Sequence, residues 1–406
     1  MLGDAEKVQL PNRLAKMYGE SPKVRPGEAK LRDMTIGDNK LWSRRHLLSR
    51  WVAAGGVLFA GAAASTERSS DAGNRIDHEY HGEILGQGNF RYRAHRFWGR
   101  LDRRQHPVRD CHGISGDRKG RIVTLTNETR NNLIAYNKAG GLIAAWEHRF
   151  PGAHGLDIVD HKGSDQYWIT DHVRQQISVC SADGEELLRV GPEVLSSKYS
   201  DITKYHPTNT ATLPDGDFFI ADGYGSSFIH HLDPDGHYIS SFGGTGTAPE
   251  NLDTPHAISI DARSGNPRLL VCDRGHNMLK WFSLDGELLK IVSLGASEKD
   301  AEPIGAGPSN VAQFGEYLGG RFKDHLAIAC LGGMVVILNG EDRVVSAVGG
   351  MPPVYREGEL QQLETFNYTF NHPHDVYVDA AGALYVAQWW SNQTYPIKLE
   401  LVDHVS

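Results

Sequence analysis

The sequence predicts an all-β fold, a six-bladed β-propeller, from two regularities. Apolar runs end at Asp171, Asp222 and Asp273, which are 51 residues apart each time. Between the last two apolar runs of each unit stands an Asp-Gly pair, at residues 183–184, 235–236 and 285–286. Asp-Gly between apolar segments is a strong hairpin signal because both residues tolerate a positive φ. Each unit is therefore expected to be a meander of about four strands, and repeats of roughly 40–50 residues built this way are typical of propeller blades.

Six copies of this unit can be counted along the chain. In order, they open at His112, His154, His206, His256, Ser309 and His374. The sixth copy is one strand short after Leu401, so we expect a strand within residues 92–98 to complete it. Such a closure joins the two ends of the ring and removes a free sheet edge. A β-sandwich with accidental periodicity is the alternative, and the nearly equal spacings disfavour it.

The N-terminal part of the chain is expected to carry an export signal. The expected parts are a disordered extension over 1–42, a signal peptide over 43–65, a linker over 66–90 and the propeller catalytic domain over 91–406. Paired arginines precede an apolar run that is too short to span a bilayer, which resembles a twin-arginine signal. We expect a periplasmic or secreted protein, with an uncleaved anchor as the alternative. Met34 is the expected start if the first residues are a mis-assigned extension.

Composition narrows the classes of partner. The chain has 406 residues, a net charge of −8 and 40% hydrophobic residues, and its body has no basic cluster. This is an ordinary soluble composition with ample core, and it argues against nucleic acid as a partner. We expect a small-molecule or peptide substrate, no membrane contact after signal cleavage, and a monomer.

Histidines at the start of alternate copies predict a metal site. The innermost strand of a propeller blade lines the central channel, and His154, His256 and His374 open the second, fourth and sixth copies. Alternate blades of a six-fold ring are 120° apart by symmetry, so these imidazoles can converge and leave an open face. Three imidazoles with an exchangeable position suit a catalytic zinc. Water-bonded histidines at a channel mouth are the alternative, which the alternate-blade pattern disfavours.

The remaining copies open on a mixed set of side chains, His112, His206 and Ser309. Because this second trio lacks one histidine, we expect it to provide polar lining or substrate contacts rather than a second metal site.

Two further side chains are expected on the same rim. In an antiparallel meander the start of the first strand and the end of the second lie at one face, so the loops after Asp222 and Asp273 surround the channel mouth. These loops carry Tyr224 and Arg274. A guanidinium and a divalent cation nearby favour the phenolate, which makes Tyr224 a candidate general base. The aspartates themselves are expected to hold the turns.

Five short segments, in order and with similar spacing, resemble the blades of peptidylglycine amidating lyase, the second catalytic domain of the peptide-amidating enzyme. They are AHGL at His154, DGYGSSFI at Tyr224, TPHAISI at His256, DRGHN at Arg274 and HPHDVYVD at His374. The resemblance covers roughly residues 110–400 and implies a propeller of NHL-like repeats.

The resemblance also implies site residues and a reaction. Zinc would be bound by His154, His256 and His374, the base would be Tyr224, and its neighbouring arginine would be Arg274. A structural calcium would be bound by Asp375 and by the backbone carbonyls of Leu156 and Ile114. The family reaction cleaves a carbon–nitrogen bond of a peptidyl-α-hydroxyglycine and gives a peptide amide and glyoxylate.

One departure from the family concerns the substrate. Asn127 stands where the family has a second active-site arginine, which removes a bidentate partner for a carboxylate. We expect Asn127 and His206 to contact substrate and predict a zinc-dependent lyase acting on an α-hydroxyglycine-like carbinolamide. A metal-dependent propeller hydrolase of the lactonase or esterase kind is one alternative, although a calcium held by Asp, Glu and Asn would suit it better. A non-catalytic NHL-repeat binding protein is the other.

Overall fold

A computed structural model describes residues 82–147, 150–295, 306–315, 320–365 and 369–402. All of them belong to the second of two compact units, which spans Ser69–Ser406. The predicted extension over 1–42 and the signal peptide over 43–65 lie outside the described residues, so export and cleavage stay predictions. Among the described residues, no helix has the length and apolar character needed to cross a membrane.

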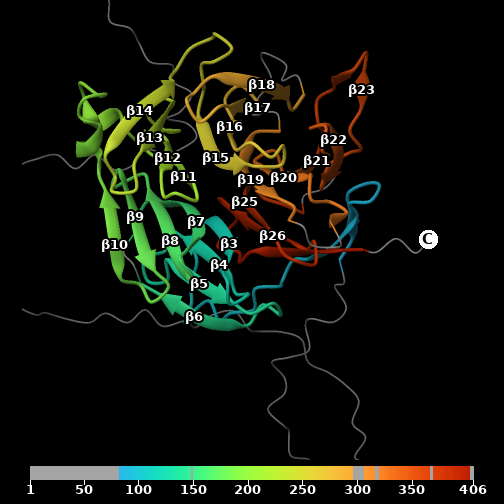
Figure 1. Cartoon of the computed structure of the whole chain (residues 1–406). Helices are drawn as coiled ribbons and strands as arrows, with labels where there is room; N and C mark the ends of the chain where they lie inside the picture. The colour runs from blue at the N-terminus through green and yellow to red at the C-terminus, as the bar shows by residue number, and fades with distance from the viewer. Residues whose placement is uncertain (1–81, 148–149, 296–305, 316–319, 366–368, 403–406) are drawn as a thin grey trace, which may run out of the picture. The chain divides into compact units, whose positions relative to one another are not determined.

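Six antiparallel sheets form the blades of a propeller, with the first strand of each blade innermost (Figure 1). Blade one comprises β3 (Cys111–Gly116), β4 (Ile122–Thr126), β5 (Leu133–Tyr136) and β6 (Leu142–Trp146). Blade two comprises β7 (Ala153–His161), β8 (Ser164–Asp171), β9 (Gln176–Ser181) and β10 (Glu186–Val190). Blade three comprises β11 (Asn209–Thr212), β12 (Phe218–Ala221), β13 (Phe228–Leu232) and β14 (Tyr238–Gly243). The prediction of six meandering blades is confirmed.

The second half of the ring repeats the pattern. Blade four comprises β15 (Pro255–Asp261), β16 (Arg268–Asp273), β17 (Met278–Phe282) and β18 (Leu288–Ser293). Blade five comprises β19 (Pro308–Gln313), β20 (Leu326–Cys330), β21 (Met334–Leu338) and β22 (Val344–Val348). Blade six comprises β25 (Pro373–Val378), β26 (Leu384–Gln388) and β27 (Ile397–Leu401), with β2 (Tyr92–His95) and β1 (Ile84–Leu85) at its outer edge. Short elements lie between blades: η1 (Pro192–Leu195), η2 (Ile202–Lys204), β23 (Tyr355–Arg356) and β24 (Glu359–Leu360).

The ring closes through the N-terminal strand, as predicted. Strand β2 pairs antiparallel with β27, with Tyr92 opposite Leu401. The fold nevertheless begins before residue 91, because β1 falls within the expected linker over 66–90. Leu85 and Phe90 are buried in an apolar cluster there, and the side chain of Gln87 donates hydrogen bonds to blade five. The burial of these two apolar side chains explains why this stretch is ordered.

The closing strand is expected to contribute strongly to stability. The Tyr92 side chain is fully buried, so Tyr92→Ala should lower the free energy of unfolding by about 3–5 kcal/mol, the cost of removing a large buried aromatic. Chemical denaturation followed by circular dichroism measures this loss. Glu400→Gln is the control, because the exposed Glu400–His95 pair in the same sheet contributes less than about 1 kcal/mol. Equal midpoints for the two variants would contradict this role of the closing strand.

The hairpin turns differ from the sequence expectation in one detail. Gly184, Gly236 and Gly286 have φ of 88°, 85° and 88°, whereas the preceding aspartates are not among the positive-φ residues. In the first of these turns Gly184 N–H donates to the Ser181 carbonyl and Ser181 N–H donates to that of Glu185. This is a type I turn followed by a left-handed glycine, so only the glycine needs the positive φ.

The core lies between neighbouring blades rather than in one central mass. Between blades four and five, for example, Trp281 and Leu279 pack in one cluster with Ile328 and Val336, all fully buried. Because each blade buries both faces, the middle strands are apolar on both sides. The innermost strands line the channel, and they carry the polar residues of the candidate site.

Candidate metal centre

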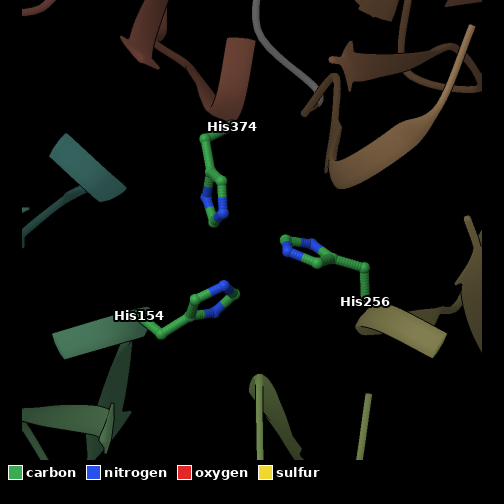
Figure 2. A group of neighbouring side chains, drawn as sticks. All are labelled: His154, His256 and His374. Carbon is green, nitrogen blue, oxygen red and sulfur yellow. The ribbon is translucent and has the colours of Figure 1, made fainter. Parts of the chain in front are cut away.

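Three histidines from the innermost strands of alternate blades converge in the channel. His154, His256 and His374 come from β7, β15 and β25, and their rings point toward one another (Figure 2). Their ring centroids are 4.6–4.7 Å apart, which is nearly an equilateral triangle. One nitrogen of each ring lies within 4.8 Å of the others, and all three residues are buried. The structure therefore brings together the three predicted zinc ligands.

A β-bulge places each of these histidines. In blade two the pairing register shifts between Ala153 and Gly155, so that His154 is the extra residue. The same shift occurs around His256 in blade four and around His374 in blade six. A bulge disrupts the ladder locally and re-aims a side chain. The bulges account for the common orientation of the three rings toward the channel axis.

The odd-numbered blades hold the rings in place. The Nδ1 atoms of His154, His256 and His374 lie 2.8, 2.6 and 2.7 Å from the backbone carbonyl oxygens of Thr208, Ser309 and His112, respectively. A carbonyl can only accept, so Nδ1 carries the proton and donates it. The remaining nitrogen, Nε2, then keeps its lone pair for the centre, which is the usual arrangement of a metal-binding histidine.

The surroundings keep these rings neutral. Burial lowers the pKa of His154, His256 and His374 well below the usual range, and the neighbouring imidazoles or Arg274 lower it further. Neutral imidazole is the form that binds a metal ion. The three nitrogens, their spacing and their carbonyl partners together fit a zinc ion with one open position.

Tyr224 lies directly over this centre. Its hydroxyl is 3.0 Å from Nε2 of His154 and 3.0 Å from Nε2 of His256. The guanidinium carbon of Arg274 is 5.3 Å from the centre of the tyrosine ring, close enough for a cation–π contact. The structure thus places both predicted catalytic side chains beside the trio.

The loop that carries Tyr224 is held by a buried aspartate. The carboxylate of Asp222 accepts hydrogen bonds from the backbone N–H groups of His206 and Ser226, each at 2.6 Å. Asp222 is fully buried, as are Asp171 and Asp273 at the matching positions. These strand-ending aspartates hold the turns, as the repeat predicted.

His206 and Asn127, the two residues predicted to contact substrate, do not lie on the innermost strands. Thr208, not His206, occupies the position in blade three that matches His112 and Ser309, because its carbonyl accepts the hydrogen bond from Nδ1 of His154. His206 lies two residues earlier, where its Nδ1 contacts the His172 carbonyl at 3.1 Å. Asn127 is engaged by Asp110: its amide nitrogen donates to the carboxylate at 3.0 Å and its oxygen accepts from the Asp110 N–H at 2.9 Å. The repeat count misplaced His206 because the first hairpin of blade three is shorter: Thr208 stands 14 residues before Asp222, whereas His154 and His256 stand 17 residues before Asp171 and Asp273.

Two more histidines surround the trio. The ring of His112 lies 5.2 Å from that of His154 and 4.7 Å from that of His374, and burial lowers its pKa to about 4. The ring of His172 lies 5.7 Å from His154 and 5.6 Å from Tyr224. His172 was not among the predicted site residues, although it follows a strand-ending aspartate just as Arg274 does. Aligning the repeats at that position is the signal that could have found it.

Carboxylates line the channel wall beside the trio. Asp375 follows His374 and accepts hydrogen bonds from the backbone N–H groups of Ile114 and Val376, both at 2.7 Å. Burial, and then the nearby Asp157, raises the pKa of Asp375 well above its usual range, and burial raises that of Asp157 to about 7. Since Leu156 precedes Asp157 on β7, the three residues predicted to bind calcium lie on adjoining innermost strands.

The pocket lined by the trio is small. Its empty space of about 150 Å³ includes open solvent, and it has no enclosed room for a water-sized sphere. It suits an ion and its ligands. Any larger substrate must therefore lie on the rim, where Tyr224 and Arg274 stand.

Fold and site together define a β-propeller with a three-histidine centre in its channel and a tyrosine over it. No protein-family profile matches the chain. Its relatives include peptidyl-glycine alpha-amidating monooxygenase B of Xenopus laevis, 25% identical over 264 residues, covering 62% of this chain and 27% of the relative. Peptidyl-alpha-hydroxyglycine alpha-amidating lyase 1 of Drosophila melanogaster is 27% identical over 261 residues, covering 58% and 42%. NHL repeat-containing protein 3 of Homo sapiens is 25% identical over 273 residues, covering 64% and 71%.

The chain spans about a quarter of the length of the amidating monooxygenases that it matches. Among solved structures, a gluconolactonase from Xanthomonas campestris superposes with a TM-score of 0.52 at 15% identity, covering 79% of this chain and 95% of that one. This likeness supports the fold alone. The lyase names among the relatives, at about 25% identity, suggest an enzyme.

Proposed function

We propose that this protein is a zinc-dependent carbon–nitrogen lyase that cleaves an α-hydroxyglycine-like carbinolamide into an amide and glyoxylate. The observation that carries the proposal is the arrangement of three Nε2 atoms, fixed by Nδ1–carbonyl hydrogen bonds, under the Tyr224 hydroxyl. The relatives named as hydroxyglycine amidating lyases support the same reaction class.

His154, His256 and His374 would hold the zinc, which supplies Lewis-acid chemistry at the α-hydroxyl oxygen when bound. Tyr224 takes the proton of that hydroxyl, because its oxygen lies 3.0 Å from two of the ligand nitrogens. The electron pair of the oxygen forms the aldehyde carbonyl, and the carbon–nitrogen bond breaks toward nitrogen. The same proton then returns from Tyr224 to the amide nitrogen, so the reaction consumes no oxidant and no water.

Arg274 supports this step through its charge. Its guanidinium lies beside the Tyr224 ring and offers a partner for the glyoxylate carboxylate on the rim. A structural calcium held by Asp375 and the carbonyls of Leu156 and Ile114 belongs to the same proposal. It is supported by the buried carboxylate of Asp375, because a hard cation prefers oxygen ligands.

The two alternatives are weaker. A propeller lactonase with a central calcium needs oxygen ligands at the channel mouth, and the trio offers nitrogen. A non-catalytic binding protein, as the NHL-repeat relative suggests, has no need of a stoichiometric zinc. Metal content separates that class from the enzymes.

Chelation should abolish glyoxylate release, and zinc should restore it. The assay follows glyoxylate from α-hydroxyhippurate, with protein purified without residues 1–65, before and after removal of metal. We expect the metal-free protein to lose at least about 100-fold in rate, because several kcal/mol of charge stabilisation disappear with the metal. Release that resists chelation, or none from protein that carries stoichiometric zinc, would contradict this reaction.

A further inference from the structure

An exposed tryptophan stands on the rim of blade six. Trp390 lies in the loop over 389–396, between β26 and β27, and 69% of its surface is exposed. It is the most exposed large hydrophobic side chain among the residues described. Single exposed hydrophobic side chains are ordinary on protein surfaces, so what distinguishes Trp390 is the way in which its ring is held.

This indole is held in position. Its ring lies at 28° to the ring of His372, with 5.9 Å between centroids, and Trp389 packs edge-on against the same histidine at 5.5 Å. The backbone N–H of Trp390 donates to Asp110 at 3.0 Å, and that of Trp389 donates to the His372 carbonyl at 3.0 Å. The exposed face of Trp390 is therefore presented by a fixed stack of rings.

The backbone of the stack lies in the left-handed region. His372 has φ of 47° and Trp390 has φ of 49°, and two further residues of the loop, Asn392 and Gln393, also have positive φ. Bulky residues avoid this region because the side chain crowds the backbone, at a cost of about 1–3 kcal/mol each. Strain of this kind is concentrated at functional sites, and here it fixes the direction of the indole.

The neighbouring polar pair supports the loop. One carboxylate oxygen of Asp110 accepts from the Trp390 N–H, and the other accepts from the Asn127 amide. Asn127 in turn accepts from the Asp110 N–H. Asn127 thus acts through Asp110 as a positioning residue for the tryptophan loop.

The stack adjoins the metal centre. His372 is two residues from His374, so their Cα atoms are at most about 7.6 Å apart. Pro373 pairs with Gln388 across the first two strands of the blade, so the next residue, Trp389, lies beside the start of the strand that carries His374. The pocket at the trio has no enclosed room for an acyl group, so the acyl group of a substrate bound there extends over the rim, and on the side of blade six it meets this stack.

We propose that Trp390, backed by His372 and Trp389, is an aromatic subsite that binds the acyl group of the substrate, and that the preferred substrates are N-aroyl carbinolamides. The inference rests on the proposed lyase function and specifies its substrate class. A flat aromatic ring covers the exposed indole face and gains an offset-stacking contact beyond simple burial, which a small aliphatic acyl group lacks.

The test compares two substrates that differ only in the acyl group, N-benzoyl- and N-acetyl-α-hydroxyglycine. We expect wild-type protein to favour the benzoyl compound in kcat/KM, and Trp390→Ala to reduce that preference about tenfold, chiefly through KM. Trp390→Phe should retain most of it. Phe97→Ala is the matched control, since Phe97 is also an exposed aromatic, 63% exposed, outside this loop, and its variant should keep the wild-type preference.

Measurements of direct binding test the aromatic subsite independently of the lyase reaction. Hippurate and N-acetylglycine lack the α-hydroxyl, and calorimetry with zinc-loaded protein measures their affinities without turnover. Tighter binding of hippurate that Trp390→Ala removes supports the subsite, even if neither hydroxylated compound releases glyoxylate and the lyase proposal fails. Glyoxylate release with equal preference in wild-type and Trp390→Ala protein overturns the subsite while the lyase proposal stands.

Discussion

His256→Ala is expected to remove the bound metal and glyoxylate release together while leaving the propeller folded. The substitution deletes one of three nitrogens that meet at the centre of the trio. Changes to the partners of metal-binding histidines alone cost roughly 10–100-fold in affinity, so loss of a ligand should exceed about 100-fold. Metal analysis after dialysis, with circular dichroism for the fold, measures both parts of the expectation.

His237→Ala is the matched control for this variant. His237 lies in an exposed turn with Asp233 and Asp235, the other group of side chains among the described residues that could hold an ion. Its replacement should leave the metal content at one zinc per chain. Zinc that remains bound in the His256→Ala variant but is lost from the His237→Ala variant would place the metal site in this turn. That result would contradict a metal site in the channel.

Tyr224→Phe should retain the metal and lose about 10²–10⁴-fold in kcat, the usual range for removal of a general acid or base. Phenylalanine keeps the ring beside Arg274 but lacks the oxygen that lies 3.0 Å from two ligand nitrogens. Turnover of α-hydroxyhippurate by zinc-loaded protein measures the effect. Tyr355→Phe, which alters a hydroxyl bonded to the Val344 backbone in another blade, serves as the control. Unchanged kcat in Tyr224→Phe would show that another group moves the proton.

The propeller could be predicted because its determinants are local and repeated. An apolar run that ends at an aspartate and a hairpin turn at glycine each specify a short meander, and equal spacing then implies a ring. The closing strand at Tyr92 followed from the missing strand of the last copy. The ordered structure of residues 84–90 could not be predicted in the same way. It depends on burial against blade five, and a short segment of sequence does not show that burial.

The part of the site that follows from the symmetry of the ring could be predicted. Histidines in alternate copies had to face one axis, and the structure brings them together. The bulges that aim them and the carbonyls that orient them depend on how neighbouring innermost strands approach, and the sequence does not display that approach. The same limit explains the mistaken place of His206 and the oversight of His172, since loop lengths between strands vary from blade to blade.

Anomalous diffraction at the zinc edge tests directly the proposal that the trio binds zinc. Crystals of zinc-loaded protein should show one zinc peak per chain, bound by Nε2 of His154, His256 and His374 at about 2.0–2.1 Å, with Tyr224 beside the open position. A peak at another site, or a trio that stays without metal when zinc is supplied in excess, would contradict it.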